Sequence, residues 1–254
     1  MVERLGYVQI DTIAVVQRAH EHVLWSRRPD YEPQMLHQLQ AVDRRVFEYW
    51  THAASYVPMT DYRFYAPGMR RFADGERMQS WRRDNGKLTR HVLRRIREEG
   101  ALAASDFEAP PGKRGPWWDW KPAKRALEYL FWAGELTISE RRGFQRLYDL
   151  TERVLPEWVD TTEPSPEEQA QFSVRRTLGN YGVADVPHVR YWLRDEGAVA
   201  AALVDLIDAG EVTPVRVRGW EGGRSTHSRP LSRPRPAGNA AGGASTSCLP
   251  STTW

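Results

Sequence analysis

The stretch Ala126–Thr137, ALEYLFWAGELT, decides the fold, because the chain repeats it at Ala202–Thr213 as ALVDLIDAGEVT. Both copies read A-L-x-x-L-x-x-A-G-E-[L/V]-T. In the first copy, alanines and leucines recur at helical spacing on one face. Gly134 then follows as a glycine C-cap does. A strand-like run rich in arginine comes next in each copy. The repeat therefore predicts, twice, a helix that ends at glycine and leads into a β segment.

More helical sequence precedes each copy of the repeat. An amphipathic segment at 86–100, GKLTRHVLRRIREEG, and the short piece SDFE precede the first copy, and PEEQAQFSVRRTLGNYG and DVPHVRYWLRDEG precede the second. Helix, short helix, helix and hairpin is the order of a winged helix-turn-helix unit. We therefore predict winged helices at 86–158 and 165–220, in preference to generic helical hairpins with strands. The expected fold class is mainly α with small β wings (α+β).

The two ends of the chain are less regular. Within residues 1–85, YEPQMLHQLQAVDRRVFEYW looks helical and FEYWTHAASYVP has strand character. If the chain is a run of winged helices, LGYVQIDTI is the wing end of a partial first unit, and its helices would precede Met1. We assign 1–85 to that unit and its connecting helices. Residues 221–254 are rich in Gly, Ser, Pro, Arg and Ala without apolar periodicity, which predicts a disordered tail.

Composition limits the class of protein. The 254 residues are 41% hydrophobic and 27% charged, which is typical of a soluble globular protein, and the formal charge of +3 is compatible with nucleic acid. The single cysteine, Cys248, excludes a disulfide framework and a cysteine-based zinc site. No apolar run approaches the length that spans a bilayer, so we expect a cytoplasmic protein without membrane contact. Eleven tryptophans provide either core mass or stacking surfaces for bases.

The segment Gln9-Ile10-Asp11 is a candidate catalytic pair. In an extended chain, residues i and i+2 project to the same side, so the amide and the carboxylate would stand together. An aspartate can act as a general base toward water or stabilise a cationic transition state. A glutamine can hold a water by hydrogen bonds. The alternative is a solvated strand edge followed by Asp11 as the N-cap of a helix.

A second group of candidates lies in FEYWTHAASY. This segment places Trp50, His52 and Tyr56 close together. His52 could shuttle protons or contact phosphate, or it could be a hydrogen-bonded structural residue. His20 and His22 have no acidic or cysteine partners at ligand spacing, so we expect neither a metal nor another cofactor.

Tryptophans and arginines supply candidate DNA contacts. Trp117 and Trp118 in GPWWDWKP either stack on nucleotides or cover the start of the following helix in the core. Arg141, Arg142 and Arg146 lie in the first predicted wing, where arginine suits contacts to the phosphate backbone. A solvated charged face is the alternative for these arginines.

Several long segments together resemble the YcaQ/AlkZ-like family of winged-helix DNA glycosylases. They are VQIDTIAVVQRAHEHVLWSR, FEYWTHAASYVP and WWDWKPAKRALEYLFWAGELTISERRGFQRLYDLTERVLPEW, and the resemblance runs from about Leu5 to Trp220. It implies a DNA repair enzyme that excises N-alkylated purines, and some members unhook interstrand crosslinks. The active-site motif of the family is Q-hydrophobic-Q or Q-hydrophobic-D, which places the site at Gln9 and Asp11.

The resemblance also implies a chemistry. A purine alkylated at N3 or N7 is cationic and leaves readily, so the enzyme needs a carboxylate that stabilises the oxocarbenium-like sugar and orients water. Asp11 is that carboxylate, and Gln9 positions the water or the sugar. No lysine stands out near the motif, so we expect a monofunctional enzyme. The expected partner is alkylated double-stranded DNA, bound by a monomer at the nucleoid. A non-catalytic winged-helix regulator and an inactive fragment are the alternatives.

Two departures from the family pattern lead to expectations about the ends of the chain. Family members carry a longer segment before the motif, so we expect a truncated N-terminus. They also continue into a sheet-rich C-terminal part, opened by a segment like SPFDPLVWDR. Codons can be chosen for CLPSTTW that read S-P-F-D-N-L in a shifted frame. We therefore expect residues after about Gly219 to be an out-of-frame reading.

Overall fold

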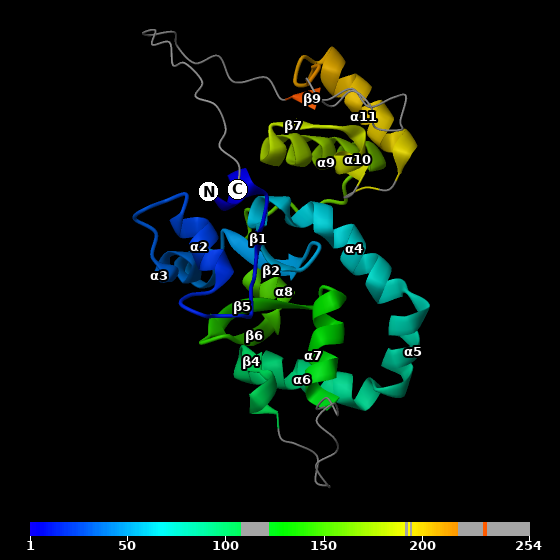
Figure 1. The fold of residues 1–254 in the computed structure, drawn as a ribbon. Helices are drawn as coiled ribbons and strands as arrows, with labels where there is room; N and C mark the ends of the chain where they lie inside the picture. Colours follow the sequence, from blue (N-terminus) through cyan, green and yellow to red (C-terminus); the bar gives the residue numbers. More distant parts are fainter. Residues whose placement is uncertain (108–121, 191–192, 194, 218–230, 233–254) are drawn as a thin grey trace.

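Helices dominate the chain, and small antiparallel sheets punctuate them (Figure 1). The computed structural model describes residues 1–107, 122–190, 193, 195–217 and 231–232. Within these residues lie three sheets of three strands each. In every one of them the strand that comes last in sequence lies between the other two. This arrangement confirms the predicted α+β fold class.

The second of the three units contains the first copy of the repeat. Its helix α7 packs Leu127 and Leu130, both fully buried, against Ile96 of α6 and Ile138 of β5. The chain turns out of α7 at Gly134, whose φ of 75° belongs to the left-handed region that glycine favours. The order of elements is the one predicted for a winged helix: α6 (Gly86–Glu99), β4 (Leu102–Ala103), η3 (Ala104–Asp106), α7 (Pro122–Trp132), β5 (Leu136–Arg142) and β6 (Gln145–Leu150).

The third unit contains the second copy and repeats this order. Its elements are α9 (Pro166–Tyr181), β7 (Val183–Ala184), α10 (Val186–Arg190), α11 (Glu196–Asp208), β8 (Thr213–Pro214) and β9 (Leu231–Ser232). The strand β9 lies inside 221–254, the segment predicted to be a disordered tail. Its backbone pairs with both β7 and β8, and this pairing completes the sheet. The other residues of the predicted tail lie outside those described.

The first unit differs from our prediction in its order. The segment LGYVQIDTI is not a wing, because its strand β1 (Val8–Gln9) comes first in the sheet and pairs with β3. The wing is the hairpin of β2 (Val46–Trp50) and β3 (Ala54–Pro58). Two helical segments follow β1 within this unit. They are α2 (Ala19–Trp25) and α3 (Pro33–His37), the latter continuing into the π-helical turn η1 (Gln38–Val42). Strand character alone does not distinguish a first strand from a wing; the pairing partner does.

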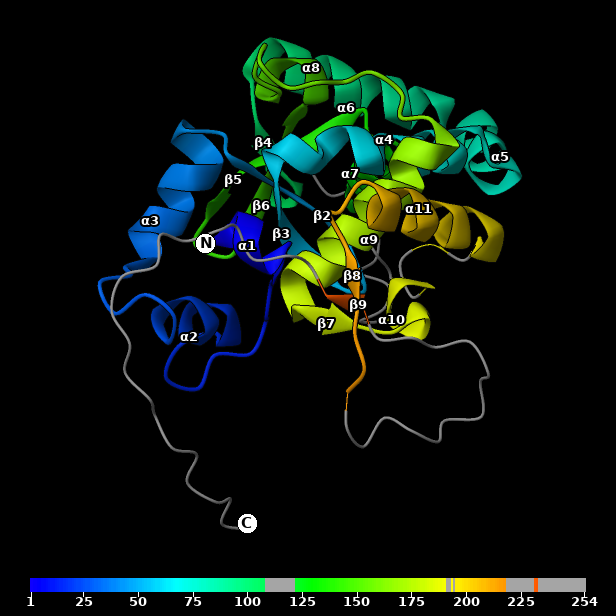
Figure 2. The same cartoon turned by 90° about the horizontal axis from the view of Figure 1, so that it is seen from above.

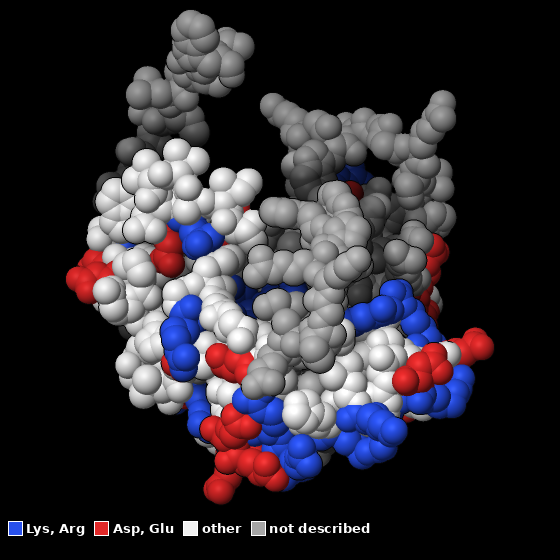
Figure 3. Space-filling view, turned by 90° about the horizontal axis from the view of Figure 1, so that it is seen from below, with Lys and Arg blue, Asp and Glu red and all other residues white. Residues whose placement is uncertain are grey.

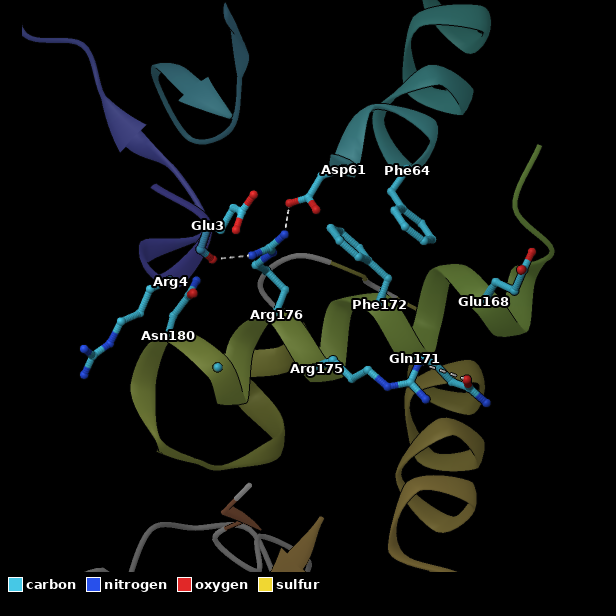
Figure 4. A pocket seen from close by; sticks show the side chains of 11 residues that line it. Glu3, Arg4, Asp61, Phe64, Glu168, Gln171, Phe172, Arg175, Arg176 and Asn180 are labelled. Atoms are coloured by element: carbon cyan, nitrogen blue, oxygen red, sulfur yellow. Dashed lines mark hydrogen bonds and ion pairs between the residues drawn. The ribbon is translucent and has the colours of Figure 1, made fainter. Parts of the chain in front are cut away.

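Further helices connect and join the units. The connecting elements are α1 (Val2–Leu5), η2 (Met59–Asp61), α4 (Tyr62–Asp74), α5 (Glu76–Asp84) and α8 (Thr151–Val154), and α4 and α5 form an arc from the first unit to the second (Figure 1). Figure 4 shows how α9 lies against α1 and α4. Arg176 donates to the carbonyl of Glu3 at 2.8 Å and pairs with Asp61, while the rings of Phe64 and Phe172 stack at 3.9 Å. The third unit is thereby fastened to the first.

Candidate active site

A cleft of about 450 Å³ lies between the first and third units. Figure 2 shows α1 and the chain that follows it passing between α2 and α9. The cleft is lined by Leu5, Tyr7, Val8, Gln9, Asp11, Ala19, His20, Val23, His52, Asn180 and Tyr181. The structure therefore brings together three of the predicted site residues, which are Gln9, Asp11 and His52.

Gln9 ends the strand β1 and is held by the wing of its own unit. Its side chain is exposed, whereas the next residue, Ile10, is 6% exposed and packs in the core. The alternation follows from the extended backbone. Nε2 of His52 donates to Oε1 of Gln9 at 2.8 Å, and the ring of Tyr7 packs edge-on against His52 at 5.3 Å. His52, in the turn of the β2–β3 hairpin, thus orients the amide of Gln9.

Asp11 stands at the start of an irregular loop. It is not the N-cap of a helix, because α2 begins at Ala19 and the loop 12–18 intervenes. Oδ1 of Asp11 accepts the backbone N–H of Ile13 at 2.8 Å, which fixes the carboxylate in a local turn. The carbonyl of Asp11 accepts from Nη1 of Arg18 at 3.4 Å. Asp11 is half-buried and lines the cleft.

His20 is a lining residue to which sequence reasoning assigned no role. It is 4% exposed, and its Nδ1 accepts the backbone N–H of Asp11 at 3.1 Å. Its Nε2 lies 3.5 Å from Oε1 of Glu21. Burial lowers the pKa of His20 below its usual value of 6.5, so the ring is neutral at pH 7. The spacing of His20 and Leu24 on the buried face of α2 indicated that His20 points inward, but only the fold shows that it meets Asp11.

Trp50 and Tyr56 flank the cleft without lining it. Tyr56 is 5% exposed, and its ring lies 6.1 Å from that of His20, so it supports the site from behind. Trp50 is 47% exposed and packs on Trp132 at 5.4 Å. It lines a neighbouring aromatic cavity of about 680 Å³ that shares Tyr7 with the cleft. Trp117 and Trp118, the predicted stacking residues, lie outside the described residues.

The three predicted phosphate contacts divide into different roles. Arg141 is largely buried and donates from Nε and Nη2 to the two carboxylate oxygens of Glu48, at 2.5 and 2.7 Å. Nε of Arg146 lies 3.6 Å from the same carboxylate. Glu48 is 2% exposed, so these arginines neutralise a buried charge of the first unit. Arg141 is therefore part of the core and not a surface available to phosphate. Arg142, at the end of β5, is exposed, and its contact to phosphate stays a prediction.

The surface charge and the potential metal ligands give few further indications of function. Seen from below, Figure 3 shows Lys and Arg interspersed with Asp and Glu along the rim of the molecule. Over the part of the chain that the structure describes, no group of three or more His, Cys, Asp or Glu is arranged to hold a metal ion. In the same part, no helix has both the length and the apolar character needed to cross a membrane.

Three helical units with small antiparallel sheets, and a cleft that holds Gln9 and Asp11, are the features with which the chain can be compared with known proteins. Residues 2–244 match the family described as DNA glycosylase AlkZ-like, and the chain belongs to this family. The matched range extends beyond Gly219, as far as residue 244.

A solved structure shares the fold. It is the DNA glycosylase AlkZ of Streptomyces sahachiroi, with a TM-score of 0.57 and 19% sequence identity. The similarity covers 91% of this chain and 62% of that chain, so the present chain spans less than two thirds of its structural relative. At this identity the likeness concerns the fold alone.

Proposed function

We propose that the chain is a monofunctional DNA N-glycosylase that hydrolyses the N-glycosidic bond of purines alkylated at N3 or N7 in double-stranded DNA. The observation that carries this proposal is the cleft, where Gln9 and Asp11 lie together in a chain of a DNA glycosylase family. We also propose that the chain acts as a monomer. An enzyme with this substrate works where chromosomal DNA lies, in the cytoplasm at the nucleoid.

The chemistry follows from the charge of the lesion. Alkylation at N3 or N7 makes the purine a cationic leaving group, so departure of the base needs no strong general acid. Positive charge then develops on the sugar, and the carboxylate of Asp11 stabilises it and orients the attacking water. Oε1 of Gln9 is engaged by His52, which leaves its amide nitrogen to donate to that water or to the sugar. In this scheme His52 orients Gln9 and transfers no proton during the reaction.

Two further features concern the product and the range of lesions. Among the described residues that line the cleft there is no lysine, which supports a reaction without a covalent Schiff-base intermediate and with an abasic site as its product. Gln9 and His52 are exposed. A base that cannot be rotated fully out of the duplex can therefore still reach Gln9. Interstrand crosslinks are lesions of this kind, and we propose them as further substrates.

The test is release of N7-methylguanine from methylated duplex DNA. Asp11→Asn removes the negative charge and keeps the shape, so release should fall by about 1,000-fold, as for loss of one electrostatic contact to a transition state. Binding to the duplex should stay within a few-fold. The matched control is Asp84→Asn, an exposed aspartate on α5, which lies across the molecule from α2 (Figure 1). Its release should equal that of the wild type.

The same assay separates the alternatives. Unchanged release by Asp11→Asn would contradict the assignment of the site. A sequence-specific footprint without base release would indicate a winged-helix regulator. If the present chain releases no base and a version extended at both ends does, the chain is an inactive fragment of such an enzyme.

A further inference from the structure

The loop that carries Asp11 has few attachments to the rest of the first unit. Its apolar side chains point outward, with Val15 91% and Val16 85% exposed. The N–H of Ile10 donates to the carbonyl of Ala54 at 2.7 Å and so still belongs to the sheet. The next N–H, that of Asp11, leaves the sheet and donates to Nδ1 of His20. The contact that fixes Asp11 against the cleft must therefore be made where the chain leaves the sheet.

We infer that His20, in its neutral form, is a positioning residue whose Nδ1 holds the backbone of Asp11 and so presents the carboxylate to the cleft. This inference rests on the proposed function, because it assigns His20 to the reaction of Asp11. Arg18 acts beside it, donating from Nη1 to the carbonyls of Asp11 and Thr12 at 3.4 and 2.6 Å. The N–H and the carbonyl of Asp11 are thereby both hydrogen-bonded, and the N–H is bonded to the imidazole of His20, which titrates.

The protonation state decides whether the bond to Asp11 exists. A ring nitrogen that accepts a hydrogen bond carries no proton, so the proton of neutral His20 is on Nε2. Nε2 faces Oε1 of Glu21 at 3.5 Å. Protonation at Nδ1 would set one N–H against another and break the bond. The loop then loses its attachment, and a displacement of about 1 Å at a catalytic group can cost on the order of 100-fold in rate.

The surroundings of His20 keep it neutral at physiological pH. Burial is the largest influence and lowers the pKa, and the positive charges of Arg141 and Arg18 lower it further. The negative charges of Glu21 and Asp11 raise the pKa, each by less than burial lowers it. Two tyrosines complete the group, Tyr56 against the ring and Tyr31, whose hydroxyl donates to Oε2 of Glu21 at 2.5 Å. Activity limited by His20 is therefore full at pH 7 and falls only below pH 6.5.

Three variants test the role of His20 in single-turnover base release. His20→Asn keeps an acceptor near the position of Nδ1 but cannot be protonated, whereas His20→Leu removes the acceptor. The control, His22→Leu, changes an exposed histidine on the same helix. We expect His20→Leu to be about 10- to 100-fold slower with DNA affinity within a few-fold, and His20→Asn to recover most of the rate. His22→Leu should match the wild type.

The pH dependence of base release distinguishes a positioning role of His20 from a role in packing alone. The wild-type rate should fall below pH 6.5, and this acid limb should be absent from His20→Asn. The inference is overturned if the limb persists unchanged in His20→Asn, or if folded His20→Leu releases base at the wild-type rate. It is also overturned if His20→Asn is as slow as His20→Leu. If His20→Leu does not fold, the profile of His20→Asn decides.

A readout that needs no activity distinguishes this inference from the proposed function. Hydrogen exchange of the Asp11 amide should be slow in the wild type and in His20→Asn, and at least 10-fold faster in His20→Leu. If the wild type releases no base, the proposed function fails whatever His20 does. Rapid exchange of the Asp11 amide in the wild type at pH 7 would instead overturn the attachment itself, even in an active enzyme.

Discussion

An aspartate follows the first strand in all three units, and it has a different task in the first. In the second unit, Oδ2 of Asp106 accepts the N–H of Ala103 at 2.8 Å and closes the short helix η3. In the third, Oδ1 of Asp185 accepts the N–H of His188 at 3.2 Å, in the first turn of α10. In the first, Asp11 bonds the N–H of Ile13, but no helix follows this turn. In the second and third units the aspartate bonds a backbone N–H at the start of a helix, whereas Asp11 presents its carboxylate to a cleft.

The loop that separates Asp11 from the next helix explains this difference. The helix α10 begins directly after Asp185, whereas residues 12–18 separate Asp11 from α2. Without a helix to start, the loop depends on side chains, among them that of its own last residue, Arg18. Arg18 holds its carbonyls, and the guanidinium of Arg18 lies 3.5 Å from the ring centre of Phe144, in the turn between β5 and β6. The wing of the second unit thus supports the loop of the first.

The largest expected effect on stability comes from Glu48, whose ion pair with Arg141 joins the first unit to the wing of the second. The carboxylate of Glu48 is buried between Arg141 and Arg146 and accepts from Nε2 of Gln40 at 3.1 Å. Glu48→Gln leaves the guanidinium of Arg141 buried without its counter-charge, which costs about 3 to 5 kcal/mol of unfolding free energy. Urea unfolding measures the loss. The control is Glu157→Gln, an exposed glutamate, which should change stability by less than about 0.5 kcal/mol. Equal effects would show that the wing does not support the first unit.

The two copies of the repeat offer a sharper comparison of the second and third units. Gly134 and Gly210 both have left-handed φ, 75° and 72°. A Cβ on Gly134 would lie 2.9 Å from Sδ of Met69 and 3.1 Å from its Cβ, whereas one on Gly210 would meet nothing within 4 Å. Gly210→Ala should therefore cost about 1 kcal/mol for backbone strain. Gly134→Ala should cost about 2 to 3 kcal/mol, because it also overpacks a buried contact.

Thermal or urea unfolding of the two glycine variants, measured side by side, checks this difference. The strain term is common to both, so the excess in Gly134→Ala isolates the contact between the second unit and α4. A larger loss at Gly210 than at Gly134 would contradict this account of the two copies.

The same repeat shows what could be predicted from the sequence and why. Helical spacing ending at Gly134, followed by strand residues, is local information, so the second and third units were predicted correctly in their order of elements. The wing of the first unit was misplaced because Val8 and Gln9 have strand character that fits either end of such a unit. Only their pairing with Tyr56 and Ser55, far along the chain, shows which end it is.

The residues of the candidate site also fall into two groups. Some could be predicted from the local sequence, and others are brought to the site only by the fold. Gln9 and Asp11 could be predicted because their spacing and the family motif are local. The bond of His52 to Gln9 and that of His20 to Asp11 join residues on different elements, and neither leaves a pattern in the sequence. Arg141 was interpreted as a surface residue because its neighbours are charged. The fold places its partner, Glu48, on another unit, and burial of that carboxylate draws the arginine inward.

The smallest expected effect tests the opening comparison directly at Asp185. Asp185→Ala removes the acceptor for the first turn of α10 and should lower the unfolding free energy by about 1 kcal/mol. Asp205→Ala, an exposed position within α11, is the control and should stay within about 0.5 kcal/mol of the wild type. Base release by Asp185→Ala, measured at a temperature where the protein is folded, should be unchanged. Asp11→Ala should show the reverse, with stability nearly intact and release lost. If Asp185→Ala loses release at unchanged stability, the aspartates of the two units do not divide into cap and catalyst as we infer.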